Sequence, residues 1–365
     1  MQPTHATVLT INLEHLRHNY KVLRAASPDA KFMGVVKAGA YGSDMIRVAL
    51  ELQELGADYL AVAYAHEGTA LRDAGIRLPI LVLHAQPHNY PAIIERCLEP
   101  ALYNASTLAQ FLQVAADHRQ THYPVHIKWD TGLNRLGFKI SQMDEVLAML
   151  TDVPQIRVAS TFSHLAASED KVEDEFTGTQ IDAFAKAYTA LEQHLGYEIL
   201  AHCTNTSGLL RFPKAQFSMV RAGIGLYGYG NTEQLDRKLK PVTSLTSIVS
   251  HVNHIAAGES IGYNRSETAQ EDMHIGVIPM GHADGLLRSM GQGRGGVWIA
   301  DTWCPIMGNV CMDMIMVAVP STTQPGDAVV FFNEEHPATH LAHEVSSISY
   351  EILTSLNARI SRVYV

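Results

Sequence analysis

The fold is decided first by residues 32–63, FMGVVKAGAYGSDMIRVALELQELGADYLAVA. An apolar run, Phe32–Lys37, is followed by an amphipathic stretch that opens at Ser43 and then by a second apolar run, Asp58–Ala63. Short apolar strands that alternate with amphipathic helices predict parallel βαβ units.

The same alternation extends from about residue 10 to about residue 235. Asn12 is a suitable cap for a helix that places Leu13, Leu16 and Tyr20 on one face. Further apolar runs predict strands at Leu78–His84, Leu98–Tyr103, Tyr123–Trp129, Arg157–Phe162, Glu198–Cys203 and Phe217–Arg221. Eight such strands are the number that closes a (β/α)₈ barrel, of the TIM type, which we predict over residues 11–238.

The pattern changes at residue 239. Expected strands, many bounded by Gly, Pro or Asp, follow at Thr246–His254, His274–Met280, Gly296–Ala300, Pro305–Gly308, Met312–Val319 and Asp327–Phe332. Residues 239–365 are therefore predicted to form a second, mostly β domain. A short strand at Thr7–Thr10, within residues 1–10, is a candidate to pair into that domain.

The composition is that of a soluble globular enzyme, with 47% hydrophobic and 18% charged residues in 365. The net charge of −10 and the lack of a basic run argue against nucleic acid or an anionic membrane as a partner. The 4 cysteines form no Cys-x-x-Cys pair, which favours a reducing, cytoplasmic setting. Neither a signal peptide nor an apolar run of membrane-spanning length is expected.

Polar residues at strand ends are the candidates for catalysis, because active sites of such barrels lie where strands end. The first strand runs into Lys37, followed by Ala38-Gly39-Ala40. A lysine there is more often a rim cation whose stem lies along apolar surface. The small residues after it leave room for a planar cofactor, and a desolvated lysine has the lowered pKa that a covalent amine catalyst needs.

The eighth strand ends in Arg221, and Gly223, Gly225 and Gly228 follow it. Their spacing copies the dinucleotide fingerprint, but Ile248 stands where an acidic residue would be needed and no clear helix follows. A phosphate site made by the loops after strands seven and eight is the better interpretation. Residues 205–208 and 223–224 would supply hydroxyl and amide donors; ordinary turns are the alternative.

Several blocks resemble the alanine racemases, the barrel-type enzymes that use pyridoxal phosphate (PLP). The blocks follow the family's order over almost the whole chain: 37–42 (KAGAYG), 128–137 (KWDTGLNRLG), 162–166 (FSHLA), 202–206 (HCTNT), 220–228 (VRAGIGLYG), 262–263 (GY), 281–288 (GHADGLLR) and 308–313 (GNVCMD). The resemblance implies a cytoplasmic PLP-dependent isomerase that interconverts L- and D-alanine and supplies D-alanine for peptidoglycan.

It also implies roles for single residues. Lys37 would hold the cofactor covalently and act as one acid–base group, and Arg221 would face the pyridine nitrogen with His164 against the ring. The phosphate would be held by Tyr41, Asn205, Thr206, Gly223 and Ile224.

The opposite acid–base group would be Tyr263, because racemisation needs one group on each side of Cα. In the family Tyr263 and Met312 come from a second subunit, so we expect a homodimer. Arg135 would bind the substrate carboxylate. Lys128 would be carbamylated, which converts a buried cation beside Arg135 into an anionic partner.

The chain departs from the family at Gly39, Leu133, His282 and Ala358, which leaves open whether serine or another small amino acid is also a substrate. Two further alternatives are a PLP-dependent decarboxylase of the same architecture and a non-catalytic PLP carrier. Arg221 argues against the first, since decarboxylases of this architecture have an acidic residue there. The second domain argues against the carrier.

Three patterns suggest other chemistry and are weaker. Asp130-Thr131-Gly132 copies the aspartic-protease triplet but has no second copy. The histidines of residues 336–344 lack H-E-x-x-H spacing, so no metal site is predicted. Cys203 is more simply a packed barrel cysteine.

Overall fold

The computed structural model describes residues 6–365, which form two compact units. One unit contains residues 17–40 and 44–239; the other contains the described residues up to 16, together with 41–43 and 240–365. Each unit is described by itself.

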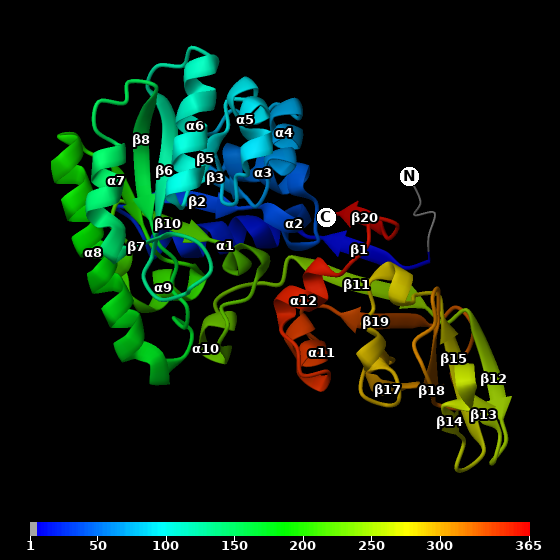
Figure 1. The fold of residues 1–365 in the computed structure, drawn as a ribbon. Coiled ribbons are helices and arrows are strands. Elements are labelled where there is room, and N and C mark those ends of the chain that lie inside the picture. The colour runs from blue at the N-terminus through cyan, green and yellow to red at the C-terminus, as the bar shows by residue number, and fades with distance from the viewer. Residues whose placement is uncertain (1–5) are drawn as a thin grey trace. The chain divides into compact units, whose positions relative to one another are not determined.

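The first unit is a barrel of eight parallel strands, so the predicted fold class is confirmed. The strands run in the order β10, β2, β3, β4, β5, β6, β8, β9, and Figure 1 shows their helices on the outside. They are β2 (Lys31–Val35), β3 (Tyr59–Val62), β4 (Ile80–Val82), β5 (Glu99–Leu102), β6 (Tyr123–Asp130), β8 (Ile156–Phe162), β9 (Leu200–His202) and β10 (Met219–Ala222). A two-residue strand, β7 (Phe138–Lys139), pairs beside β6.

The strands β4 and β5 are buried at every position, as expected for parallel strands covered on both faces. The gap between β9 and β10 is bridged by a side chain: the Ser218 hydroxyl accepts from the Ala201 amide at 2.7 Å. The barrel is therefore nearly closed by backbone pairing and completed by this hydroxyl.

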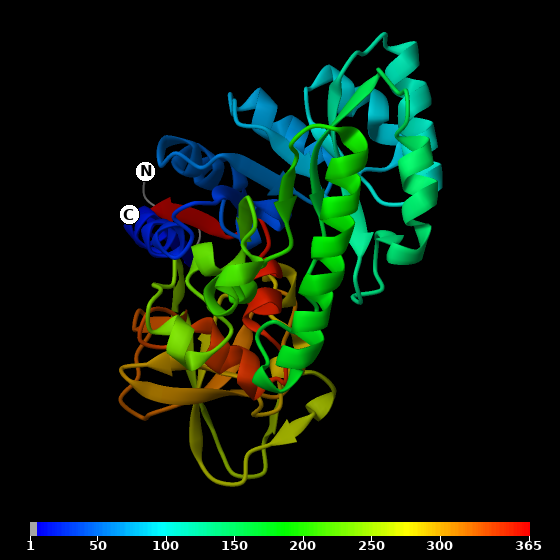
Figure 2. The same ribbon diagram turned by 90° about the vertical axis from the view of Figure 1, so that its left-hand side faces the viewer.

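Helices follow most of the strands, and the longest, α8, lies against the outside of the barrel in Figure 1 and in Figure 2. Asn12 accepts from the His15 amide at 3.0 Å and caps α1, as predicted. The helix α3, which was expected to open at Ser43, is capped one residue later by Asp44, because the Asp44 carboxylate accepts from the Arg47 amide. The helices are α1 (Leu13–Ala25), α2 (Lys37–Tyr41), α3 (Met45–Glu54), α4 (Ala65–Asp73), α5 (Tyr90–Glu95), α6 (Ala105–Asp117), α7 (Met143–Met149), α8 (Asp174–Leu195), α9 (Thr206–Arg211) and α10 (Glu233–Asp236).

The second unit is built on a nine-stranded sheet in the order β12, β15, β18, β17, β16, β19, β11, β1, β20. Its strands are β1 (Val8–Ile11), β11 (Thr243–Ile248), β12 (His251–Ile255), β15 (Met273–Ile278), β16 (Gly296–Ile299), β17 (Thr302–Met307), β18 (Ile315–Val319), β19 (Ala328–Phe332) and β20 (Ser361–Tyr364). The short pair β13 (Ser260–Ile261) and β14 (Glu267–Thr268) and the helices α11 (Ala338–Glu344) and α12 (Ser349–Thr354) complete it.

The N-terminal strand β1 pairs antiparallel with β11 and parallel with β20. Residues 1–5 of the expected segment 1–10 lie outside the described residues. The single strand expected at Thr246–His254 is wrong: the chain breaks between Ile248 and His251, and the two strands take separate places in the sheet. The buried Val249 keeps the apolar pattern unbroken across this turn, which hides it in the sequence.

In the part of the chain that the structure describes, no helix is both long and apolar enough to cross a membrane.

Candidate active site

Polar side chains gather at the carboxyl ends of the barrel strands, which is where such barrels carry their sites. Lys37 follows β2, His164 follows β8, Thr206 follows β9, and Arg221 is the next-to-last residue of β10. These ends belong to neighbouring strands in the sheet order or close to it. The fold therefore brings together residues that are up to 184 positions apart in sequence.

Lys37 does not close the first strand, as the sequence suggested; β2 ends at Val35. Lys37 instead begins a turn in which Ala38, Gly39, Ala40, Tyr41 and Gly42 all have positive φ, the left-handed region. The Glu67 carboxylate holds the start of this turn, accepting from the Ala38 amide at 2.7 Å. The same carboxylate accepts from the amides of Ala63 (2.7 Å) and Tyr64 (3.1 Å) and so ties the turn to the end of β3.

The Lys37 amine is set up to lose its proton. Burial lowers its pKa, the cations Arg135 and Arg221 lower it further, and Glu67 opposes them. Among residues 6–365 the amine has no hydrogen-bond partner, so its lone pair is available when the proton leaves. A partly buried, uncommitted amine of lowered pKa is the state that a nucleophilic or basic lysine requires.

Arg221 is buried and held by acceptors on two neighbouring strand ends. It donates to the carbonyl oxygens of Ser163 (2.7 Å), His202 (3.1 Å) and Cys203 (3.3 Å) and to a ring nitrogen of His202. Burial lowers its pKa to about 10, which leaves the guanidinium charged at neutral pH. Within the described chain its Nε donor has no partner, so one N–H remains for an acceptor in the site.

His164 lies beside this guanidinium, which donates to His164 Nδ1 at 3.1 Å. Burial, followed by the charge of Arg221, holds the pKa of His164 well below its usual range. The imidazole is therefore neutral at neutral pH, with its proton on Nε2, since Nδ1 is used as the acceptor.

The loops after β9 and β10 meet through Thr206. Its hydroxyl accepts from the amides of Gly223 (3.3 Å) and Gly225 (3.1 Å). A Cβ on Gly225 would lie 2.5 Å from the Thr206 methyl, so only glycine permits this approach. Asn205 accepts from the Gly208 amide at 2.8 Å and caps α9.

This cradle fits a phosphate group. Hydroxyl and amide donors from both loops converge there, and the buried Thr204 hydroxyl next to them has no hydrogen-bond partner in the described structure. An orphaned buried hydroxyl is costly unless a ligand satisfies it. Together with the uncommitted Lys37 amine and Arg221 Nε, the donor set matches a cofactor that carries a phosphate, a ring acceptor and a carbonyl carbon.

Lys128 lies on the barrel strand β6 and is 5% exposed. Its amine donates to the Leu136 carbonyl at 2.8 Å and lies 5.5 Å from the ring centroid of Phe162. Burial, then Arg221 and Arg135, lower its pKa to about 8, although Asp130 opposes them. Arg135 itself lies on the exposed loop after β6.

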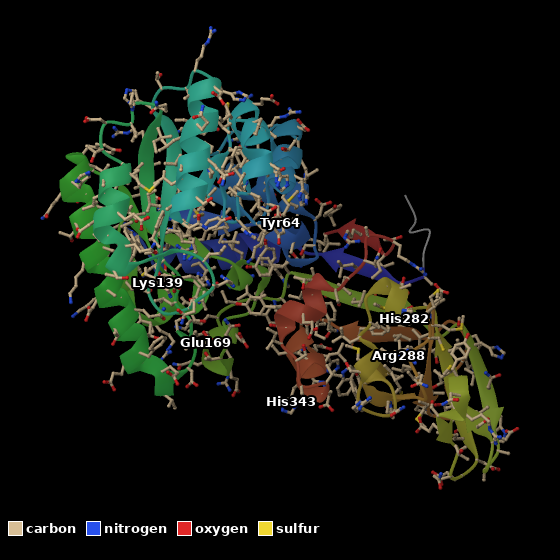
Figure 3. The ribbon with its side chains drawn as sticks, viewed as in Figure 1. Tyr64, Lys139, Glu169, His282, Arg288 and His343 are labelled. Carbon is tan, nitrogen blue, oxygen red and sulfur yellow. The ribbon has the colours of Figure 1, made fainter. Side chains whose placement is uncertain are left out.

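The protease-like triplet braces this loop. Asp130 accepts from the amides of Gly132 and Asn134, both at 3.0 Å, and pairs with Lys139 at 2.6 Å. Figure 3 shows Lys139 beside the loop. Asp130 is thus a structural residue that shapes the segment carrying Arg135.

The remaining candidates, Tyr41, Tyr263 and Met312, belong to the second unit. Tyr41 is buried, with its ring centroid 5.9 Å from that of Tyr350. Tyr263 and Met312 are 73% and 59% exposed and line one cavity of about 330 Å³, with Cys311 and Met314 also in its wall. Two large apolar side chains so exposed are typical of a surface that another molecule covers.

Three of the four departures from the family pattern lie in open positions. Gly39 has φ +64 and nothing within 4 Å of a Cβ, and Ala358 is exposed. His282, labelled in Figure 3, is exposed on a turn whose next residue, Ala283, donates to the Met312 carbonyl at 3.0 Å. Leu133 is half-buried in the loop after β6.

A cavity of about 790 Å³ is lined by Pro154, Ile156 and other residues where β6 and β8 begin, away from the strand ends that carry the candidates. None of the candidate residues lines it. The described residues contain no group of three His, Cys, Asp or Glu side chains placed to hold a metal ion.

Sequence reasoning missed two residues of this site, Glu67 and His202 as a hydrogen-bond acceptor for Arg221. Glu67 sits at the third position of α4 and looks in sequence like an ordinary first-turn carboxylate. Only the pairing of β2 with β3 brings it to the Lys37 turn.

Known proteins resemble the chain over both units. Residues 11–231 match the family model described as alanine racemase, N-terminal domain, and residues 242–364 match alanine racemase, C-terminal domain. Among curated relatives, the alanine racemase of Sorangium cellulosum is 33% identical over 100% of this chain and 99% of its own length. That of Cutibacterium acnes is 35% identical over 100% of this chain and 98% of its own.

Solved structures agree. The alanine racemase of Streptomyces lavendulae superposes with a TM-score of 0.93 at 27% identity, covering 100% of this chain and 98% of that one. The enzyme of Bartonella henselae, with covalently bound pyridoxal phosphate, has a TM-score of 0.91 at 26% identity, covering 99% of each chain.

Proposed function

Because the chain belongs to the alanine racemase family, it interconverts L- and D-alanine with pyridoxal phosphate as its cofactor, and we propose that Lys37 and Tyr263 exchange the Cα proton. The observation that carries the proposal is the uncommitted Lys37 amine of lowered pKa at the strand ends. Proton removal on one side of Cα and delivery on the other needs two groups, and the Tyr263 phenol is the second.

The cofactor, when bound, supplies a carbonyl carbon that bonds an amino group and a ring that withdraws electrons from Cα. Its phosphate would be held by Thr206, by the amides of Gly223 and Ile224 and the adjoining loop at Asn205, and by the Tyr41 hydroxyl. Arg221 would donate to the ring nitrogen, with His164 against the ring.

An arginine at position 221 restricts which reaction type the cofactor would support. A guanidinium that stays charged cannot pass its proton to the pyridine nitrogen. The ring nitrogen then stays largely unprotonated and withdraws electrons less strongly, which favours proton exchange over decarboxylation.

The substrate is a small amino acid whose carboxylate we assign to Arg135. Met312 would line the substrate pocket, and a carbamylated Lys128 would be the anionic partner of Arg135. The open surroundings of Gly39 and His282 favour testing serine beside alanine.

A homodimer with shared sites completes the proposal. The exposure of Tyr263 and Met312 supports a second copy as the molecule that covers them. The enzyme would work in the cytoplasm and supply D-alanine for peptidoglycan.

The first test is proton NMR of the PLP-loaded enzyme with L-alanine in D₂O, followed by chiral analysis. Loss of the Cα signal together with formation of D-alanine is expected. Tyr263→Phe should slow both by about a hundredfold or more, the usual contribution of a general acid–base group. Tyr64→Phe, also on an exposed tyrosine, is the control and should leave the rate unchanged. Equal rates in the two variants would refute the role of Tyr263.

A further inference from the structure

A chain of hydrogen-bonded, buried polar side chains runs from strand to strand between Arg221 and Glu99. His202, Ser160 and His126 lie between them, and each of these three is 0% exposed. We call Arg221, His202, Ser160, His126 and Glu99 the polar relay. It draws on β10, β9, β8, β6 and β5, and apart from Arg221 it contains none of the residues assigned above to the cofactor or the substrate.

The contacts of the relay are continuous. Arg221 bonds His202 Nδ1, and His202 Nε2 lies 2.9 Å from the Ser160 hydroxyl. The same hydroxyl lies 2.5 Å from His126 Nδ1, and His126 Nε2 lies 2.8 Å from the Glu99 carboxylate. Every ring nitrogen of both histidines is therefore used.

The two ends of the relay fix the direction of every hydrogen bond. A guanidinium can only donate, so His202 Nδ1 accepts and the proton of His202 sits on Nε2. An ionised carboxylate can only accept, so His126 donates from Nε2 and accepts at Nδ1. Ser160 then accepts from His202 and donates to His126, and no group in the line is left unsatisfied.

The relay also connects the buried positive charge of Arg221 to a carboxylate. Its partners in the described structure are carbonyl oxygens and imidazole nitrogens, and no carboxylate lies within ion-pair distance. A buried cation without an anion is costly, and polarised hydrogen-bond chains pass part of a distant charge along their length. Glu99 is the carboxylate at the other end of that chain.

We propose that Glu99 is a positioning residue for the cofactor, acting through His126, Ser160 and His202 to keep His202 Nδ1 as the acceptor that orients Arg221. The proposal rests on the assignment of Arg221 to the pyridine nitrogen. With Glu99 present, both ends of the relay hold the hydrogen bonds in one direction. Without the Glu99 acceptor only the Arg221 end does so, and the opposite direction gains population: His126 protonated on Nδ1, Ser160 donating to His202 Nε2, and His202 pointing an N–H at Arg221 instead of a lone pair.

The test combines Glu99→Leu with long-range proton–nitrogen NMR of the histidine rings. The apoprotein is used, so the result does not depend on the reaction. Wild type should show His126 and His202 both protonated on Nε2, and Glu99→Leu should show a measurable fraction of His202 protonated on Nδ1. His126→Asn and His202→Asn assign the signals. Unchanged tautomers in Glu99→Leu would overturn the proposal.

A second readout is cofactor affinity, measured by titration of PLP with absorbance. Glu99→Leu should raise the dissociation constant and lower kcat by about tenfold or more, the equivalent of one hydrogen bond to a charged group. The matched control is Glu51→Gln, because Glu51 is 3% exposed and pairs with Arg17 in the same unit but lies outside the relay. A fall in thermal stability alone, equal in both variants, would mean that Glu99 is only structural.

Ser160→Ala keeps the proposal testable if Glu99→Leu does not fold. It should raise the PLP dissociation constant as well. Where Glu99→Leu does fold, the double variant Glu99→Leu/Ser160→Ala should weaken PLP binding no more than the larger of the two single effects. Additive losses would contradict action through one chain of hydrogen bonds. Absence of alanine racemisation in the wild type would refute the proposed function and leave the tautomer result standing.

Discussion

The surroundings of Lys128 are unfavourable for its charged form. Its ammonium is nearly fully buried near two arginines, and one carbonyl is its hydrogen-bond acceptor. Folding therefore favours the neutral amine, which is the form that reacts with carbon dioxide. The environment supports carbamylation chemically, because an anion at this position would face Arg135 and Arg221 favourably.

Lys128 should make folding stability depend on pH. The unfolded lysine keeps its proton up to a pKa of about 10.4, whereas the folded residue releases it at about 8. Between these values the unfolded state binds more protons, so stability should rise with pH over this window. Calorimetry of the apoprotein in carbon-dioxide-free buffer should show this rise, and Lys128→Met should reduce it.

An equal pH slope in wild type and Lys128→Met would contradict the assignment. Carbon-13 NMR in labelled bicarbonate provides the companion measurement. A carbamate signal is expected in wild type and should be missing from Lys128→Met.

At the scale of elements, the left-handed turn after Lys37 is the most unusual feature. Five successive residues adopt positive φ, which costs L-residues about 1–2 kcal/mol each outside glycine. Two of the positions, Gly39 and Gly42, are glycine, and they differ in their surroundings. The turn stores strain next to the amine that we propose acts in the reaction.

Replacing each of these two glycines by alanine should lower the free energy of unfolding by different amounts. Gly39→Ala faces open space, so only its φ of +64 is unfavourable, and it should cost about 1 kcal/mol. Gly42→Ala would also place its Cβ 1.9 Å from the Leu353 carbonyl oxygen, so the loss should be clearly larger. Urea unfolding of both variants measures the difference, and equal losses would show that the backbone contact yields easily.

The secondary-structure elements were predictable where the hydrophobic pattern of the sequence extends over many residues. Every barrel strand was expected within a few residues of its place, because apolar runs separated by helical periods leave few alternatives. Boundaries were less predictable. The cap at Asp44 and the break after Ile248 depend on local hydrogen bonds and on the sheet partner that each strand finds.

At the scale of the whole molecule, the proposed shared site makes a prediction about mixtures. Lys37→Ala and Tyr263→Ala should each be inactive alone. When the two are unfolded together and refolded, or co-expressed, half of the dimers should be mixed, and each should contain one site with both native residues. About a quarter of the wild-type activity should then return, as expected for a two-fold symmetric dimer.

A mixture that stays inactive, although light scattering shows dimers, would place both acid–base groups in one chain. A monomeric wild type would refute the assembly directly. A mixture of Lys37→Ala with Arg221→Ala is the matched control, because both residues lie in the barrel unit and no mixed dimer would hold an intact site.

The sequence by itself determined the barrel and the β-rich second domain, and it predicted the candidate site residues. Periodicity and strand-end position are local properties, so they can be read without knowing which segments touch. Lys37, Arg221 and the Thr206 loop were identifiable in this way.

Tertiary structure alone decided how those residues are supported. Glu67 reaches the Lys37 turn because β2 pairs with β3, and Glu99 is connected to Arg221 through three hydrogen-bonded side chains on the strands between them. Such contacts join residues tens of positions apart, and their energy comes from burial and from complete hydrogen bonding. Neither burial nor complete hydrogen bonding can be assigned to a single segment before the barrel has folded around it.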